Sequence, residues 1–250
     1  MTAPVPYWSR DGLALYLGDC REILPALGVQ ADLVLTDPPY ADTDLAWDVW
    51  PKGWVAAAAS VSSSMWCFGS MRMFLRFGAE FEASGWKFSQ DLIWEKNTGT
   101  NPMVDRFRRI HEHALHFYRG RWDAIRHATP RIRHPGARIG VMSRQRQGRA
   151  GHLGHYGPSI YVDDGTRLHN SVIHHPNMLG KGIHTTQKPA KVLQPLLMYG
   201  CPRGGLVVDP FAGSASTLWT AMQLGRRAIG IEGSEEILQR AVDTLESRPW

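Results

Sequence analysis

The sequence has few cysteines and no long apolar run. Cys20, Cys67 and Cys201 are the three cysteines in 250 residues, and they lie far apart. This excludes a disulfide framework and disfavours a cysteine-rich zinc site. The longest apolar stretches, such as Val55–Val61, are far shorter than a membrane span. The N-terminus lacks the charged and apolar regions of a secretory signal, so we expect a cytoplasmic protein without a membrane segment.

Acidic residues are scarce in one part of the chain. Residues 106–149 contain twelve arginines, but only Glu112 and Asp123 as acids, which gives this segment a net charge of +10. The whole chain carries +5, so the remainder carries −5. Arginine binds phosphate and guanine, and the segment therefore favours a nucleic-acid partner. A solvated arginine-rich face or loop is the alternative explanation.

The apolar and charged fractions, 43% and 20%, are typical of a folded chain. Strand-like and helix-like segments alternate up to about residue 95 and again from residue 184. This alternation predicts an α/β fold with a doubly wound, mostly parallel sheet covered on both faces. The predicted strands are 13–17, 31–36, 64–68, 86–94, 113–118, 205–209 and 227–232. The predicted helices are 21–27, 54–61, 71–83, 189–198, 217–224 and 235–245.

The alternation stops between these two regions, where glycine, proline, histidine and arginine dominate. We expect a small, loop-rich insertion over residues 121–180. Residues 1–120 and 181–250 would then form the catalytic domain, split in the sequence by the insertion.

One strand–turn–helix unit has the pattern of a nucleoside-cofactor site. The strand GLVVD ends at Asp209, the turn PFAGS follows, and a helix begins after it. A glycine-bearing turn allows close approach of a ligand, and a helix N-terminus presents free N–H groups. The next strand ends at Glu232, 23 residues after Asp209, where an acidic side chain can bind ribose hydroxyls. The phosphate-binding P-loop pattern is absent.

A second candidate site follows the strand ADLVLT, at Asp37-Pro38-Pro39-Tyr40. Two prolines stiffen the backbone, so a carboxylate and backbone carbonyls can converge on one point. The tyrosine adds an aromatic plane. Such a set suits an exocyclic amino group on an aromatic base, and strand ends of this kind are common ligand sites in α/β sheets. A proline-stiffened turn without function is the alternative.

Three segments, ADLVLTDPPY, HTTQKP and VVDPFAGSAST followed by AIGIE, resemble the amino-group methyltransferases of DNA that use S-adenosylmethionine. The permuted order, with DPPY first and the cofactor loop last, is similar to the beta group of these enzymes. The resemblance extends to LGDC at 17–20, WEKN at 94–97 and RIHEHALHFYRG at 109–120, and it lapses over about 121–180. It implies a Rossmann-like methyltransferase fold, with the insertion as the target-recognition region.

The resemblance also implies residue roles. Asp37, Pro38, Pro39 and Tyr40 would form the catalytic tetrapeptide. Glu232 would bind the ribose, and Asp19 would lie near the adenine of the cofactor. The remaining cofactor residues would be Thr186, Gln187, Lys188, Asp209, Pro210, Phe211, Ala212, Gly213 and Ser214. One departure from the family is Ala215, where glycine is usual.

The implied reaction is methyl transfer from S-adenosylmethionine to N6 of an adenine flipped out of double-stranded DNA. Asp37 and the carbonyl of Pro38 would accept the amine hydrogens, and Tyr40 would stack on the base. Cytosine-N4 methylation is the alternative within the class, although the cytosine enzymes more often begin this tetrapeptide with serine. RNA or protein-glutamine methylation and a catalytically inactive DNA-binding module are weaker alternatives.

The sequence also indicates a macromolecular partner and a biological role. For DNA recognition the sequence points to five arginines of the insertion: Arg131, Arg133, Arg138, Arg144 and Arg146. Restriction–modification is one expected role. The oligomeric state stays open, although homodimers are common in the family. No metal site is expected, because the eleven histidines lack clustered cysteines or matched carboxylates. Most tryptophans should be core, although Trp47 and Trp50 could instead flank the base pocket.

Overall fold

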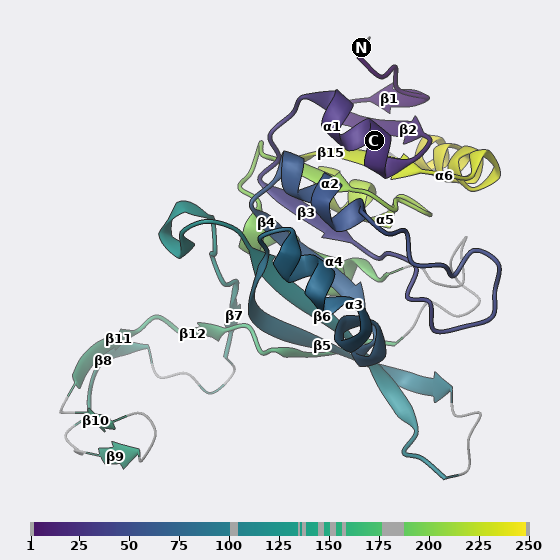
Figure 1. Ribbon diagram of the computed structural model, residues 1–250. Coiled ribbons are helices and arrows are strands. Elements are labelled where there is room, and N and C mark those ends of the chain that lie inside the picture. Colours follow the sequence, from purple (N-terminus) through teal and green to yellow (C-terminus); the bar gives the residue numbers. More distant parts are fainter. Residues whose placement is uncertain are drawn as a thin grey trace. The chain divides into compact units, whose positions relative to one another are not determined.

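The computed structural model describes residues 3–100, 105–134, 136, 139–144, 148–150, 154–156, 159–176 and 188–248. The chain divides into two compact units. The larger unit is made of Met1–Ala128 and Ser171–Trp250, and the smaller is Thr129–Asn170. The larger unit contains the helices and the main sheet, and the smaller contains short strands (Figure 1).

The main sheet runs in the order β1-β2-β15-β14-β3-β4-β6-β5-β13 (Figure 1). The central strands β2, β15, β14, β3 and β4 are parallel to one another, whereas β6 is antiparallel to both β4 and β5. The expected mostly parallel α/β sheet is therefore confirmed. The strands are β1 (Trp8–Arg10), β2 (Leu13–Leu17), β3 (Leu33–Thr36), β4 (Ser64–Gly69), β5 (Lys87–Thr100), β6 (Arg109–Tyr118), β13 (Val172–His174), β14 (Leu206–Asp209) and β15 (Arg227–Glu232).

Helices cover both faces of this sheet. Successive strand residues point to opposite sides, and both sides carry apolar residues that the helices bury. Leu33 and Leu35 of β3 pack on one side with residues of α4, α5 and α6, while Val34 packs on the other with residues of α1, α2 and α3. The sheet is thus doubly wound, as expected. The helices are α1 (Cys20–Leu27), α2 (Trp54–Val61), α3 (Met71–Ala83), α4 (Ala190–Gly200), α5 (Ser216–Gln223) and α6 (Glu235–Ser247).

Local capping explains several helix starts. The Asp19 carboxylate accepts the Arg21 N–H at the start of α1, and the Ser70 hydroxyl accepts the Met73 N–H at the start of α3. Ser234, the expected cap of the last helix, accepts the Ile237 N–H at 3.4 Å. Each cap satisfies a backbone donor that has no partner inside the helix. Glu235 and Glu236 also lie in the first turn of α6, where acidic side chains favour the positive helix end.

The smaller unit consists of nested antiparallel strand pairs. β7 (Arg131–Arg133) pairs with β12 (Thr166–Leu168), β8 (Gly140–Arg144) with β11 (Ser159–Asp163), and β9 (Gly148–Ala150) with β10 (Gly154–Tyr156). Nested pairing of this kind makes one long, interrupted hairpin. The segment was expected to be loop-rich, and the pairing supplies it with more regular structure than its composition indicates.

The compact units divide the chain differently from the expected boundaries of 121 and 180. Residues 121–128 belong to the larger unit, where Trp122 packs against Tyr118 and the Ala128 N–H donates to the Tyr199 carbonyl. On the other side, β13 pairs in parallel with β5 of the main sheet. Three-residue strands and a short 3₁₀ turn at Trp122–Ala124 leave no periodic signal in the sequence.

Gly230 of β15 lies close to the loop after β14 and to the neighbouring core. A Cβ at this position would lie 2.7 Å from the Ala212 Cβ and 2.9 Å from side-chain atoms of Leu15 and Leu218. We therefore expect Gly230→Ala to lower the free energy of unfolding by about 1–3 kcal/mol, the usual cost of overpacking a core. Urea denaturation measures this change.

The matched control is Gly78→Ala in α3, where an added Cβ would meet nothing within 4 Å. That substitution should raise helix stability by roughly 0.5–1 kcal/mol. Equal effects of the two variants would contradict the packing at Gly230.

Candidate functional site

The carboxyl ends of neighbouring parallel strands bring the two predicted motifs together. β14, which ends at Asp209, lies between β3, which leads into Asp37, and β15, which ends at Glu232. The Thr36 hydroxyl donates to Asp209 at 2.9 Å and links the two motifs directly. Residues separated by more than 170 positions therefore share one edge of the sheet, where α/β proteins commonly bind ligands.

Asp37 is held by side chains from two other segments. The Tyr40 hydroxyl donates to one carboxylate oxygen at 2.5 Å, and the Lys188 ammonium donates to the other. Lys188 is buried and also lies 3.4 Å from a carboxylate oxygen of Glu112, which in turn pairs with Lys96. Positive and negative groups thus alternate through a largely buried cluster.

The surroundings of this cluster shift its pKa values in opposite directions. Burial raises the pKa of Asp37, with a further contribution from Glu112, and outweighs the opposing effect of Lys188. Burial also raises the pKa of the Tyr40 hydroxyl, as do the nearby Asp37 and Glu112 carboxylates. For Glu112, burial is outweighed by Lys188 and Lys96, and the pKa is lowered. Lys188 keeps a raised pKa, because its two carboxylate neighbours outweigh burial.

Lys188, expected to help hold the methionyl carboxylate or to shape that pocket, has its ammonium beside Asp37 and Glu112. Its role toward the cofactor stays a prediction. Thr186 and Gln187, expected beside it, lie outside the described residues. Sequence reasoning did not identify Glu112 as a site residue. Its signal is an acidic residue in an otherwise basic segment, on a strand whose following residues Ala114–Phe117 are buried.

The buried Asp209 side chain fixes the start of the predicted cofactor loop. It is buried and accepts hydrogen bonds from the Thr36 hydroxyl and, at 3.1 Å, from the Phe211 N–H. Burial raises its pKa to about 7. Phe211 packs edge-on against Trp54, with ring centroids 5.3 Å apart. Pro210 and Ala212 are buried, whereas Gly213 and Ser214 are partly exposed.

Glu232 lies at the junction of two turns. One carboxylate oxygen accepts the Gly213 N–H and the other accepts the Ser234 N–H, each at 3.0 Å. Its carbonyl accepts the Gly18 N–H at 3.0 Å, so the turn before Asp19 lies beside it. Each carboxylate oxygen has more than one acceptor site, so a fixed Glu232 can still receive hydrogen bonds from ribose hydroxyls.

Asp19, expected near the adenine of a cofactor, caps α1 and pairs with Arg21. The Arg21 hydrogen bonds hold the pKa of Asp19 below its usual value, against a smaller effect of burial. β2 and β15 run in parallel and in register, so Asp19 and Glu232 lie at the same edge of the sheet. The arrangement fits a nucleoside bound across these two strand ends.

The backbone at Ala215 explains why glycine suits this position. Its φ is 56° and its ψ is 26°, in the left-handed region, and the residue is fully buried at the start of α5. Left-handed backbone costs an L-residue roughly 1–2 kcal/mol, which is why glycine suits this position. The alanine methyl is nevertheless accommodated in the core.

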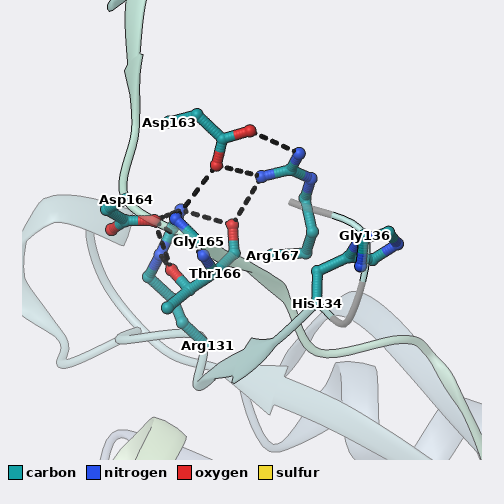
Figure 2. Close-up of polar contacts among 8 residues, drawn as sticks. All are labelled: Arg131, His134, Gly136, Asp163, Asp164, Gly165, Thr166 and Arg167. Carbon is teal, nitrogen blue, oxygen red and sulfur yellow. Dashed lines mark hydrogen bonds and ion pairs between the residues drawn. The ribbon is translucent and has the colours of Figure 1, made fainter. Parts of the chain in front are cut away.

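The five predicted DNA-binding arginines have different surroundings. Arg131 donates to the Thr166 hydroxyl at 2.6 Å and lies 3.4 Å from Asp164 (Figure 2). Figure 2 also shows Arg167 facing Asp163. Hydrogen bonds from the Arg167 side chain and the Gly165 N–H lower the pKa of Asp163 to about 2. Arg133 is exposed. Arg138 and Arg146 lie outside the described residues, and Arg144 is described by its backbone in β8.

Within the described ranges, no group of three or more histidine, cysteine, aspartate or glutamate residues is arranged to hold a metal ion. In the same part of the chain, no helix is both long enough and apolar enough to cross a membrane.

Comparison with known proteins agrees with the geometry at the sheet edge. The model of a DNA methylase family, the N6/N4 methyltransferases, matches residues 31–243. The type II methyltransferase M2.DpnII of Streptococcus pneumoniae is 24% identical, over 97% of this chain and 92% of its own length. The type II methyltransferase M2.LlaDCHI of Lactococcus lactis subsp. cremoris is 22% identical, over 96% of this chain and 91% of its own length.

Solved structures show the same fold. The M1.HpyAVI–SAM complex is 22% identical with a TM-score of 0.64, over 93% of this chain and 99% of that one. The cytosine-N4-specific PvuII DNA methyltransferase is 16% identical with a TM-score of 0.64, over 96% of this chain and 88% of that one. The chain belongs to the N6/N4 DNA methyltransferase family, whose members use S-adenosylmethionine.

The buried charge cluster generates a stability prediction. Lys188→Met should lower the free energy of unfolding by about 3–5 kcal/mol near neutral pH, because it leaves the buried Asp37 carboxylate without its ammonium partner, whereas Glu112 keeps Lys96. The pKa of the Asp37 carboxyl, which burial already raises, should then rise further above its unfolded value. Protonation would favour the folded state, so the deficit should shrink as the pH falls.

Urea denaturation between pH 8 and pH 5 measures this dependence. The double variant Lys188→Met/Asp37→Asn removes the stranded charge and should recover part of the loss. A pH-independent deficit would contradict the proposed charge balance.

Proposed function

We propose that this DNA methyltransferase transfers a methyl group from S-adenosylmethionine to N6 of an adenine flipped out of double-stranded DNA. The observation that carries the proposal is the position of Asp37. Its carboxylate follows β3 next to the strand end at Asp209, with Glu232 one strand further. A target amine and a cofactor methyl group can therefore be brought together across neighbouring strand ends.

The residues at the sheet edge fit the cofactor in their chemistry. Glu232 is fixed by two backbone N–H groups and suits ribose hydroxyls, while Asp19 lies at the neighbouring strand end. The turn Asp209–Ser214 leads into the N-terminus of α5, which has no side-chain cap and suits the methionyl carboxylate. When bound, S-adenosylmethionine supplies an electrophilic methyl group on its sulfonium.

Asp37 and the Pro38 carbonyl would act on the target amine. The nitrogen lone pair of adenine N6 is delocalised into the ring, and acceptors for both amine hydrogens would localise it toward the methyl group. Asp37 already accepts from Tyr40 and Lys188, so the target amine would compete with these donors. Tyr40 would then stack on the flipped base, which is inaccessible inside a duplex.

Adenine is favoured over cytosine by the first residue of the tetrapeptide. Among similar enzymes, the cytosine-N4 group more often has serine there, and this chain has Asp37. Cytosine-N4 methylation remains the second candidate, because the PvuII enzyme of that specificity shares the fold. An inactive DNA-binding module is disfavoured by the intact Asp37, Tyr40 and Glu232, and Ala215 alone favours it.

The biological setting is part of the same proposal. The two similar relatives are type II methyltransferases, which supports a cytoplasmic restriction–modification role. Double-stranded DNA is the macromolecular partner, and we assign its sequence recognition to the insertion, predicted as 121–180 and including the compact unit Thr129–Asn170. The homodimer common among family members stays a prediction.

Two substitutions should separate the catalytic and cofactor roles. Asp37→Ala should lower methyl transfer by several orders of magnitude with little change in S-adenosylmethionine affinity, because it removes an acceptor used in the transition state. Glu232→Ala should instead weaken cofactor binding by about 1.5–3 kcal/mol through lost charge-assisted hydrogen bonds. Labelled methyl transfer to plasmid DNA and calorimetry of the cofactor measure the two effects. Wild-type turnover in Asp37→Ala would show that the tetrapeptide is wrongly assigned.

The five predicted DNA-binding arginines should not behave alike. Arg133 is exposed, so Arg133→Ala should act on DNA binding, either lowering the salt slope by about one for a phosphate contact or costing roughly 1–3 kcal/mol for a base contact. Arg131→Ala should also destabilise the smaller unit, because it removes the contacts with Thr166 and Asp164.

Salt-dependent binding measurements on all five variants, Arg131, Arg133, Arg138, Arg144 and Arg146 to alanine, test the assignment. Unchanged affinity, salt slope and site preference throughout would exclude the insertion as the DNA reader.

A further inference from the structure

The loop after the catalytic tetrapeptide is organised by one buried carboxylate. Asp48 is 6% exposed, although it lies in a polar loop between β3 and α2. One of its oxygens accepts the N–H groups of Tyr40 and Ala41, at 2.7 and 2.8 Å. The other accepts the N–H groups of Asp42 and Thr43, at 3.0 and 2.8 Å, and the Thr43 hydroxyl at 2.7 Å. A single side chain therefore satisfies four successive backbone donors.

This contact also explains the backbone conformation. Ala41 has a φ of 53°, in the left-handed region that costs an L-residue roughly 1–2 kcal/mol. Successive N–H groups in a turn of this kind converge and form a concave anion site. Burial raises the pKa of Asp48, but the hydrogen bonds from Thr43, Ala41 and Asp42 outweigh it, and the pKa is lowered. The carboxylate is thus ionised at neutral pH and stabilises the strained turn.

The other end of the loop is attached to α3. Trp50 stacks on Phe77 with ring centroids 4.3 Å apart, and its indole N–H donates to Glu80 at 2.7 Å. The second oxygen of Glu80 accepts the Gly53 N–H at 2.6 Å. Trp50 is therefore a packing residue, whereas Trp47 is 59% exposed. This end is attached separately, and Asp48 accepts the backbone N–H groups from Tyr40 to Thr43, while Arg76 donates to the Ala41 carbonyl at 3.4 Å.

We propose that Asp48 is a positioning residue for methyl transfer, which holds the backbone from Tyr40 to Thr43 and thereby sets the Tyr40 ring and the Pro38 carbonyl for the target base. Asp48 acts through its hydrogen bonds to the loop and does not itself contact the reacting atoms. The proposal rests on the proposed function of Asp37 and Tyr40. It extends the reaction machinery to a residue eleven positions beyond Asp37.

The test compares Asp48→Asn with Asp44→Asn. The first substitution keeps the side-chain shape but removes the charge and replaces an acceptor by a donor that faces N–H groups. Asp44 is an exposed carboxylate in the same loop, so Asp44→Asn makes the same charge change without disturbing the turn. Asp48→Asn should speed hydrogen exchange of the Tyr40–Thr43 amides at least tenfold. It should slow single-turnover methyl transfer to DNA about 100-fold, the size expected for displacement of a reacting group by about 1 Å.

Two further measurements separate positioning from general damage. S-Adenosylmethionine affinity of Asp48→Asn should stay within twofold of wild type, because the cofactor-loop contacts are unchanged, and Asp44→Asn should match wild type in every measurement. Wild-type transfer rates in Asp48→Asn, or a parallel loss of cofactor affinity, would overturn the proposal.

If Asp48→Asn does not fold, Thr43→Val serves as the milder variant, because it removes one hydroxyl donor to Asp48. A severalfold loss of rate with faster exchange of the same amides supports the proposal, and an unchanged rate contradicts it. Failure of the proposed function is distinguishable, since wild type itself would then place no methyl group on N6 of adenine in DNA. The exchange measurement would still report on the Asp48 contacts.

Discussion

The site depends on the parallel alignment of β3, β14 and β15. Adjacent strands lie about 4.8 Å apart, so three neighbouring carboxyl ends place three side-chain groups within a span that one nucleoside-sized ligand can cover. Val208 of β14 pairs with Val34 of β3, and Asp209 pairs with Gly230 of β15. A one-residue slip would turn Asp209 to the opposite face of the sheet. Both faces are buried, so such a slip would disrupt the packing of Val207 and Val208 and the hydrogen bonds of Asp209 with Thr36 and Phe211.

A buried polar cluster then connects segments that the chain order keeps apart. Asp37, Glu112 and Lys188 come from three distant segments and meet through ion pairs. Buried ion pairs add little net stability over apolar packing, but breaking one is costly. Here the ion pairs favour one relative position of the three segments, because Lys188 can contact both carboxylates only in that position. The same contacts occupy the Asp37 oxygens and so connect the fold to the proposed reaction.

Local patterns explain what the sequence predicts well. The strand-end motifs at Asp37, Asp209 and Glu232 combine an apolar strand with a turn, and both signals lie within a few residues of each other. Contacts between distant residues have no such signal, which is why the sequence indicates neither the ion pair of Lys188 with Asp37 nor the proximity of Glu112. Asp48 lies in a polar loop, where an acidic residue ordinarily indicates exposure. The short strands of the smaller unit lack the alternation that identifies longer ones.

The central claim is that Asp37 receives the N6 amine of adenine in DNA. The most direct measurement is nucleoside mass spectrometry of duplex DNA after incubation with the enzyme and S-adenosylmethionine carrying an isotopically labelled methyl group. The account predicts that the label is found in N6-methyldeoxyadenosine. Label in N4-methyldeoxycytidine, or none in the DNA, would contradict it.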